Sequence, residues 1–210
     1  MAMKDRILGV DYADDVEVAY RNGELGDTPL IEKIMDDAVR AGMTHVAWRV
    51  SHIGKLTYRT SAGTIQDGHQ AVRLSLTPFG LIMSRCDPME VAVRAAHERG
   101  LKLWFYICLF DERYQYPTGE LSESWIGAKY PEYYSQHFQQ EDERVRGVFS
   151  LAYPDVKKYF LDIVKEGLDY GADAVYLDCA RTHASANMVP VGGWWPHWTN
   201  PYLAYGYNEP

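Results

Sequence analysis

The sequence predicts an α/β fold of the (β/α)8 TIM-barrel type, of which this chain supplies the first four strand–helix units. Three observations support this fold class. A glycine separates each of three predicted helices from an apolar strand, and the strands have the near-continuous apolar character of a parallel sheet covered on both faces. The links from strand to helix are also far longer than the links from helix to strand, and in such folds the long links build the active site.

The glycine-punctuated repeat is visible in the segments VRAGMTHVAWRV, AHERGLKLWFYI and LDYGADAVYLD. A glycine stands at each junction, where the end of a helix favours a residue with left-handed backbone: Gly42, Gly100 and Gly171. The apolar segments after these glycines are predicted strands, and an earlier strand opens the series: Ile7–Tyr12, Thr44–Val50, Leu101–Leu109 and Ala174–Asp178.

The intervening helices have recognisable starts and apolar faces. Thr28-Pro29 places a capping residue before a proline at the first helical position, and Asp87-Pro88 repeats the arrangement with Glu90 three residues after the cap. Two apolar stripes at helical spacing are predicted to face the sheet, the first made by Ile31, Ile34, Met35 and Ala38, the second by Val156, Phe160, Ile163, Val164 and Gly167.

Residues 1–210 are predicted to form a single domain, the amino-terminal half of a (β/α)8 barrel and part of a longer protein. A typical barrel has eight strands in about 250 residues, whereas this chain has four predicted strands and long loops. The first and fourth strands would be exposed edges, so a missing carboxyl-terminal half or self-association is expected. A doubly wound sheet is the alternative, but Asp11–Asp15 follows the first strand where such a sheet has a glycine-rich phosphate turn.

Composition narrows the classes of partner and compartment. The net charge is −8 and no Lys/Arg run occurs, which argues against a nucleic-acid partner. No apolar run is long enough to span a membrane, and the first ten residues carry charges in place of an apolar leader, which favours a soluble, cytoplasmic protein. Three scattered cysteines fit no disulfide framework or zinc motif, and Cys108 and Cys179 are expected to be buried free thiols.

The catalytic candidates are carboxylates at predicted strand ends. Asp178 ends the fourth strand, where its side chain would project into the barrel mouth as a nucleophile or an acid/base. A structural ion pair with Arg181 is the alternative role. Asp111, with Glu112 beside it, follows the third strand and is a candidate second carboxylate, although exposed loop acids are common. No cofactor or metal is predicted, since no metal-binding, P-loop, nucleophile-elbow or dinucleotide motif is present.

The substrate-binding candidates surround the same predicted mouth: Asp11, Arg49, His52, Tyr106, Arg181 and His183. Arg49 ends the second strand and is expected to pair with Asp11, because a buried arginine near a strand end usually pairs with a carboxylate. For Asp11, structural hydrogen bonding is an equal alternative, and His52 could be an ordinary loop histidine.

Aromatic side chains supply a further signal. Trp194, Trp195 and Trp198 lie in a short polar segment, and the loop after the third strand adds Trp125 and several tyrosines. Flat rings with a polar edge suit the apolar C–H faces of sugars. Small cores inside large loops would explain about half of these aromatic residues, and the three late tryptophans are the strongest candidates for sugar contact.

The run Gly147–Val156 (GVFSLAYPDV), followed by a predicted helix and by Tyr170–Asp178 (YGADAVYLD), resembles the glycosyl-hydrolase-like (β/α)8-barrel proteins, the family-10-like glycosylhydrolases. In that family a SxAYPEV segment precedes a helix and a YGxDGxxLDxxR strand. Asp155 stands where the pattern has Glu, and Ala174 where it has Gly. Pro131-Glu132-Tyr133 and the closing residues 205–210 also look like the family.

This resemblance implies a sugar-hydrolase barrel that continues past Pro210, with Asp178 and Arg181 at its mouth. Asn208-Glu209-Pro210 also looks like the Asn-Glu-Pro signature of retaining glycosidases, which makes Glu209 a catalytic candidate as acid/base. In that signature the glutamate ends the fourth strand, whereas here it falls about thirty residues after the predicted strand end.

The sequence therefore predicts a glycoside hydrolase that acts on a carbohydrate through carboxylates at the carboxyl ends of the barrel strands. Two alternatives stay open: a catalytically silent carbohydrate-binding barrel, and a metal-dependent sugar isomerase or epimerase. A carbohydrate is the expected partner in all three cases, and neither nucleic acid nor a membrane is expected in any of them.

Overall fold

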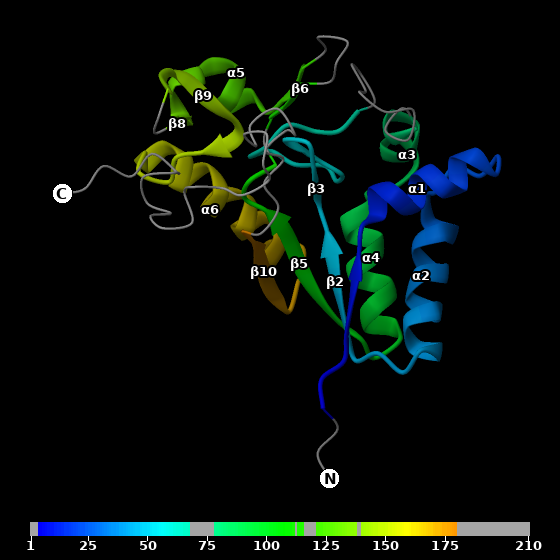
Figure 1. Ribbon diagram of the computed structural model, residues 1–210. Coiled ribbons are helices and arrows are strands. Elements are labelled where there is room, and N and C mark those ends of the chain that lie inside the picture. The colour runs from blue at the N-terminus through cyan, green and yellow to red at the C-terminus, as the bar shows by residue number, and fades with distance from the viewer. Residues whose placement is uncertain (1–3, 68–77, 112, 116–120, 138–139, 180–210) are drawn as a thin grey trace, which may run out of the picture.

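The computed structural model describes residues 4–67, 78–111, 113–115, 121–137 and 140–179. A four-stranded sheet forms the centre of this part of the chain, and its strands are β1 (Ile7–Val10), β2 (His45–Arg49), β5 (Lys102–Cys108) and β10 (Ala174–Asp178). The order in the sheet is β1-β2-β5-β10, and every neighbouring pair is parallel (Figure 1). The predicted α/β class with a parallel sheet is confirmed, and closure into a barrel stays a prediction.

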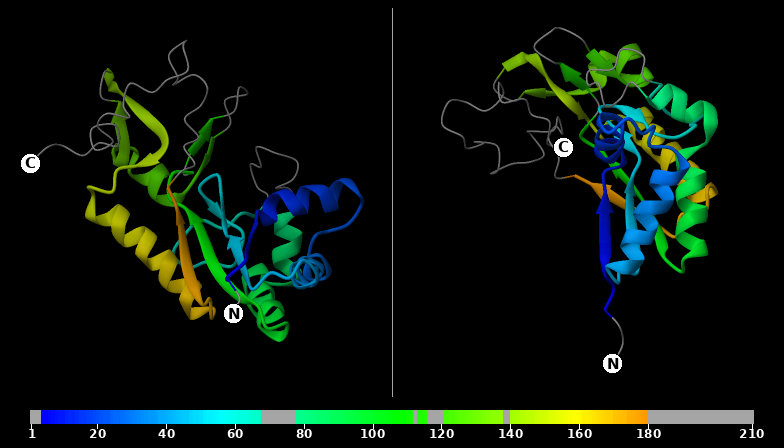
Figure 2. Two further views of the ribbon diagram at one scale, coloured as in Figure 1. Left: turned by 60° about the horizontal axis from the view of Figure 1, so that its bottom comes forward. Right: turned by 90° about the vertical axis from the view of Figure 1, so that its right-hand side faces the viewer.

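Helices α2 (Thr28–Arg40), α4 (Pro88–Glu98) and α6 (Pro154–Asp169) lie along one side of the sheet (Figure 2). Their predicted apolar stripes face the core: Ile31, Met35, Ala38, Val156, Phe160 and Ile163 are buried, whereas Ile34 and Val164 are only partly buried. Gly167 is buried on the same face of α6. A Cβ at this position would lie only 2.3 Å from the Phe105 ring, so no larger residue fits there without a shift. The glycine therefore sets how closely α6 approaches β5.

The predicted helix ends are confirmed, and one of the two predicted starts is displaced. Gly42, Gly100 and Gly171 have φ values of 71°, 72° and 100°, the left-handed backbone expected after a helix. Asp87 caps α4, where its side chain accepts a hydrogen bond from the backbone N–H of Met89 over 3.1 Å. Helix α2 begins one residue earlier than predicted, with Asp27 at the cap position and Thr28 inside the helix.

The first strand is shorter than predicted. It ends at Val10, and α1 (Tyr12–Arg21) begins where the sequence predicted the last strand residue. Tyr12 is fully buried, and its hydroxyl donates a 2.6 Å hydrogen bond to the carbonyl of Gly26. The carbonyl of Asp11 meanwhile accepts from the backbone N–H groups of Asp14 and Asp15, so a helical turn replaces the end of the strand.

Short antiparallel hairpins fill the long links from strand to helix, which the apolar pattern alone did not predict. They are β3 (Ser51–His52) with β4 (Lys55–Leu56), β6 (Arg113–Gln115) with β7 (Leu121–Glu123), and β8 (Tyr134–His137) with β9 (Gln140–Phe149). The same links contain α3 (Phe79–Arg85), α5 (Trp125–Lys129) and a 3-10 helix, η2 (Pro131–Tyr133). Among the described residues, no helix combines the length and the apolar character needed to cross a membrane.

Both outer strands of the sheet carry exposed apolar side chains. Ile7 on β1 is 45% exposed, and Tyr176 and Leu177 on β10 are 45% and 49% exposed. Among the described residues, each of these strands is paired in the sheet on one side only. Unpaired apolar edges promote association with another chain or segment.

We therefore expect the purified 24.0 kDa chain to self-associate in sedimentation velocity experiments, because the outer edges of β1 and β10 have no strand partner among the described residues. Leu177→Lys should shift the distribution towards the monomer, since a charged edge residue opposes pairing. Leu161→Lys is the matched control, because Leu161 is 66% exposed on helix α6 and belongs to neither edge strand. A monodisperse monomer of the unmodified chain would contradict this prediction.

Candidate active site

Five polar side chains meet at the carboxyl ends of the four parallel strands. We call this set the carboxyl-edge cluster, and its members are Asp11, Arg49, Tyr106, Asp111 and Asp178. Asp11 directly follows β1, Arg49 is the last residue of β2, and Asp178 is the last residue of β10. All five were predicted from the sequence as catalytic or substrate-binding residues.

The register of the sheet explains why these residues meet. Arg49 pairs with Tyr106, Tyr106 pairs with Tyr176, and Asp178 pairs with Cys108. Side chains alternate between the faces of a sheet, so Asp178 lies two residues beyond Tyr176 on the face that carries Tyr106 and Arg49. This face is opposite the one that packs against the helices.

Arg49 is the centre of the cluster. Its two terminal nitrogens pair with different carboxylates, Nη1 with Asp11 and Nη2 with Asp111. The Arg49 side chain is 2% exposed, and those of Asp11 and Asp111 are 18% and 1% exposed. Burial works against the charged guanidinium, but Asp111 and then Asp11 raise the pKa of Arg49 above its ordinary value, so it stays protonated. The predicted pair of Arg49 with Asp11 is present, and Asp111 is a second partner that was not predicted.

Asp178 is held by a tyrosine. The Tyr106 hydroxyl donates a 2.6 Å hydrogen bond to Asp178 Oδ2, and Asp178 is 6% exposed. The Tyr106 ring is itself fixed by an edge contact with Tyr176, whose centroid lies 4.8 Å away at an interplanar angle of 62°. The sequence predicted Arg181 as the partner of Asp178, and Arg181 lies outside the described residues.

The β3–β4 hairpin lies against the same edge of the sheet. The backbone N–H of Cys108 donates to Ser51 Oγ over 2.9 Å, and the backbone N–H of Val50 donates to the Tyr106 carbonyl over 2.9 Å. His52 pairs with Lys55 across the hairpin, and both residues are buried. The turn between them has positive φ at Ile53 (52°) and Gly54 (74°), which is typical of a type I′ turn but unusual for a β-branched residue.

Ser51 supports the site although the sequence did not predict it. The available signal was its position two residues after Arg49, which places it on the same face as Arg49 if the extended backbone continues. Its hydroxyl oxygen accepts the hydrogen bond from β5 that attaches the hairpin to the sheet.

The cysteines near the site differ in their surroundings. Cys108 is 1% exposed, as predicted, and burial followed by the charge of Asp111 raises the pKa of its thiol to about 12. A neutral thiol is a poor nucleophile at ordinary pH, so Cys108 is not suited to covalent catalysis. Cys179 is exposed, and the prediction that it is buried was wrong, because it follows the last paired residue of the edge strand β10.

The remaining predicted site residues lie outside the described part of the chain: Arg181, His183, Trp194, Trp195, Trp198 and Glu209. Their roles stay predictions. Within the described ranges, no group of three or more His, Cys, Asp or Glu side chains has an arrangement that could hold a metal ion.

The carboxyl-edge cluster combines one cation with three carboxyl groups, those of Asp11, Asp111 and Asp178. If all three are ionised, one guanidinium leaves an excess of negative charge at the edge of the sheet. Such a site favours ligands that donate hydrogen bonds, such as hydroxyl groups, and stabilises positive charge that develops during a reaction.

Comparisons with known proteins give structural similarity at low sequence identity. No family model matches the chain, and no curated protein matches it. A hypothetical protein from Ruminiclostridium thermocellum ATCC 27405 has a TM-score of 0.49 and 15% identity, with 95% of this chain and 90% of that chain covered. A noncanonic maltogenic alpha-amylase from Thermotoga neapolitana has a TM-score of 0.43 and 14% identity, with 86% of this chain and 43% of that chain covered.

An alpha-L-fucosidase from Lactobacillus casei has a TM-score of 0.40 and 16% identity, with 75% of this chain and 45% of that chain covered. The chain thus spans less than half the length of both the amylase and the fucosidase. These two similar structures are glycoside hydrolases, but both TM-scores are below 0.5.

Proposed function

We propose that this chain belongs to a glycoside hydrolase of the family-10-like type, in which Asp178 is the nucleophile or the general base. One observation carries the proposal: Asp178 is a buried carboxyl at a strand end, and the Tyr106 hydroxyl holds it in place over 2.6 Å. Glycosidases place one of their two catalytic carboxyl groups rigidly beside the anomeric carbon. A strand-end aspartate with a fixed partner meets that requirement.

The surroundings of Asp178 suit the charge that develops during glycoside cleavage. The transition state resembles an oxocarbenium ion and carries positive charge on the sugar ring. As nucleophile, Asp178 would form a bond to the anomeric carbon while the bond to the leaving oxygen breaks. As base, it would take a proton from the water that attacks the same carbon. The carboxylates of Asp11 and Asp111 add to the negative potential at this edge.

The other members of the cluster are better suited to binding and positioning. The ion pair with Arg49 favours the ionised form of Asp111, whereas a general acid must carry a proton. We therefore assign Asp111 to substrate positioning rather than to proton donation. Asp11 is the more exposed partner of Arg49, so its carboxylate is the one of the pair more available to a sugar hydroxyl.

The general acid is then a residue outside the described part of the chain. Glu209 is the candidate for this role within the sequence. In this proposal Arg181, His183 and the tryptophans at 194, 195 and 198 would contact the sugar. His52 would contact it from the β3–β4 hairpin.

The proposal is tested by incubating the full chain with 4-nitrophenyl glycosides of several sugars in both anomeric configurations. We expect release of 4-nitrophenolate from at least one of them, because this leaving group departs as a stable anion and needs no proton from a general acid. In the proposed carboxylate mechanism, EDTA should leave the release unchanged. The anomer of the first product, identified by NMR, distinguishes retention from inversion. Activity lost on chelation would favour a metal-dependent enzyme. Saccharide binding with no release from any glycoside would favour the catalytically silent barrel.

A further inference from the structure

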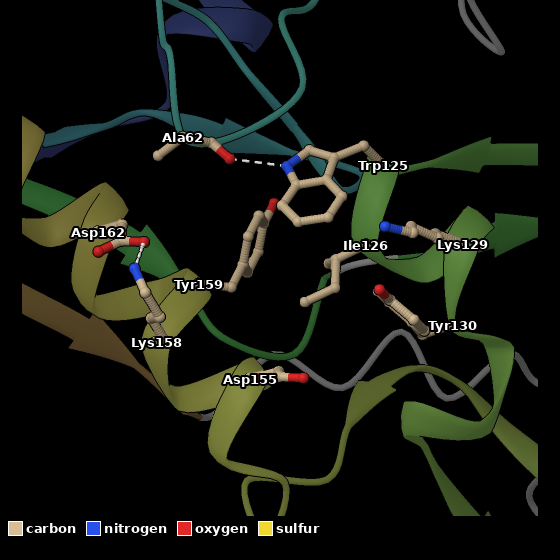
Figure 3. A pocket seen from close by; sticks show the side chains of 9 residues that line it. All are labelled: Ala62, Trp125, Ile126, Lys129, Tyr130, Asp155, Lys158, Tyr159 and Asp162. Atoms are coloured by element: carbon tan, nitrogen blue, oxygen red, sulfur yellow. Dashed lines mark hydrogen bonds and ion pairs between the residues drawn. The ribbon is translucent and has the colours of Figure 1, made fainter.

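A hollow on the helical side of the molecule is separate from the carboxyl-edge cluster. It lies between α5 and α6, and Ala62 from the link after β4 completes its wall (Figure 3). Its volume is about 210 Å³, below the 300 Å³ or so at which sites for drug-sized ligands begin. No member of the carboxyl-edge cluster lines it, so the hollow and the candidate active site share no described side chain.

The hollow has a fixed aromatic wall. The backbone N–H of Trp125 donates to Thr64 Oγ1 over 2.7 Å, and its indole Nε1–H donates to the Ala62 carbonyl over 2.7 Å. The indole also makes an edge contact with the Tyr159 ring, at 5.8 Å between centroids and 80° between planes. Trp125 nevertheless remains 45% exposed. Its polar group is thus already bonded, and the surface that it offers to a ligand is the apolar ring.

The floor is apolar and buried, whereas the rim carries balanced charge. Ile126 is 1% exposed and Tyr159 is 4% exposed. On the rim, Lys158 Nζ pairs with Asp162 Oδ2 over 2.6 Å, and Lys129 and Asp155 contribute one charge of each sign (Figure 3). Two cations and two anions leave no net charge, so neither an anionic nor a cationic ligand is favoured.

We propose that this hollow binds one ring of a neutral saccharide. The apolar C–H face of the sugar stacks on Trp125, and its hydroxyl groups exchange hydrogen bonds with Asp155 and with the Lys158–Asp162 pair. Stacking on Trp125 costs little conformational entropy, because one hydrogen bond already holds its backbone and a second holds its indole ring. Because the site is outside the carboxyl-edge cluster, this binding does not depend on hydrolysis at Asp178.

The test uses saturation-transfer NMR on the full chain with methyl α- and β-glycosides of glucose, galactose and mannose. Asp178→Asn serves as the background, so that turnover cannot deplete the probes. At least one glycoside should bind, and Trp125→Ala should weaken that binding by about tenfold or more, as expected when a stacking ring is removed. Trp125→Phe keeps a flat ring and should weaken it by less. Leu161→Ala is the matched control on α6, at a 66% exposed residue that does not line the hollow, and should change nothing.

Asp162→Ala provides a second variant that leaves the aromatic wall intact, and it should weaken binding several-fold. Thermal unfolding of each variant checks that the fold is retained. Failure of every glycoside to bind would overturn the proposal, and so would equal binding by the parent and by a folded Trp125→Ala variant. Tighter binding of glucose 6-phosphate than of methyl glucoside would overturn it too, because the balanced rim gives no preference for an anion. None of these outcomes depends on catalysis, so they leave the proposed hydrolase activity untouched.

Discussion

Replacing Asp178 by Asn is expected to lower kcat on any responsive aryl glycoside by about 10²- to 10⁴-fold, the range for loss of a positioned acid–base group. The amide cannot attack the anomeric carbon or accept a proton from water. Its oxygen can still accept the hydrogen bond from the Tyr106 hydroxyl, so the fold and the binding of substrate should be retained. Initial rates and thermal unfolding of the same preparations measure both effects.

Asp169→Asn is the matched control for this substitution. Asp169 is an exposed carboxylate that ends α6, the helix that leads into β10, and it belongs to no part of the cluster. Its replacement should leave the rate within about twofold of the unmodified chain, because surface substitutions of this kind have small effects. A similar rate for Asp178→Asn would remove Asp178 from the chemistry and return it to a structural role.

Arg49→Met is expected to destabilise the protein by about 3–5 kcal/mol, the usual cost of removing one partner from a buried ion pair. Methionine fills similar apolar space but leaves Asp111, whose side chain is 1% exposed, without its cationic partner. Arg49→Lys should be intermediate, because an ammonium group lacks the planar fork that reaches two carboxylates at once. Urea unfolding at constant pH gives the difference in free energy of unfolding.

The chain contains a closely matched control for Arg49. Arg94 also bridges two carboxylates, those of Glu32 and Glu98, but its side chain is 46% exposed. Arg94→Met should therefore cost only about 0–1 kcal/mol, as for surface ion pairs. Adding Asp111→Asn to Arg49→Met should recover part of the lost stability. Equal losses for the Arg49 and Arg94 variants would show that burial of the Arg49 network does not determine its strength.

The parallel sheet was predictable because its signals are local. Gly42, Gly100 and Gly171 have left-handed backbone and each stands shortly before an apolar strand, so both features can be read within about ten neighbouring residues. The early end of β1 had no such signal. Helix α1 begins there with Tyr12, whose hydroxyl bonds to the Gly26 carbonyl 14 residues away, a contact that the local sequence does not reveal.

The site residues at strand ends could be predicted from the sequence, whereas the partners of loop residues could not. Asp11, Arg49 and Asp178 directly end or follow strands, so the carboxyl ends of a parallel sheet bring them to one edge. Asp111 lies three residues past β5, and its pairing with Arg49 spans 62 residues. Nothing in the local sequence distinguishes such a buried loop carboxylate from an exposed one. The hairpins in the links were likewise unpredicted, because all of their strands except β9 have only two to four residues.

The coincidence of sheet order with chain order has a consequence for how the protein is made. The amino-terminal residues leave the ribosome first, and β2 can pair with β1 before β5 has been synthesised. Each later strand then extends an edge that already exists, so the sheet can grow in one direction during translation. The link between β5 and β10 is the longest connection between neighbouring strands of the sheet. The outer edge of β5 therefore has no strand partner until this link and β10 have been synthesised. Synthesis of the hairpins within that link therefore sets the interval during which a nascent sheet edge is open to other chains in the cell.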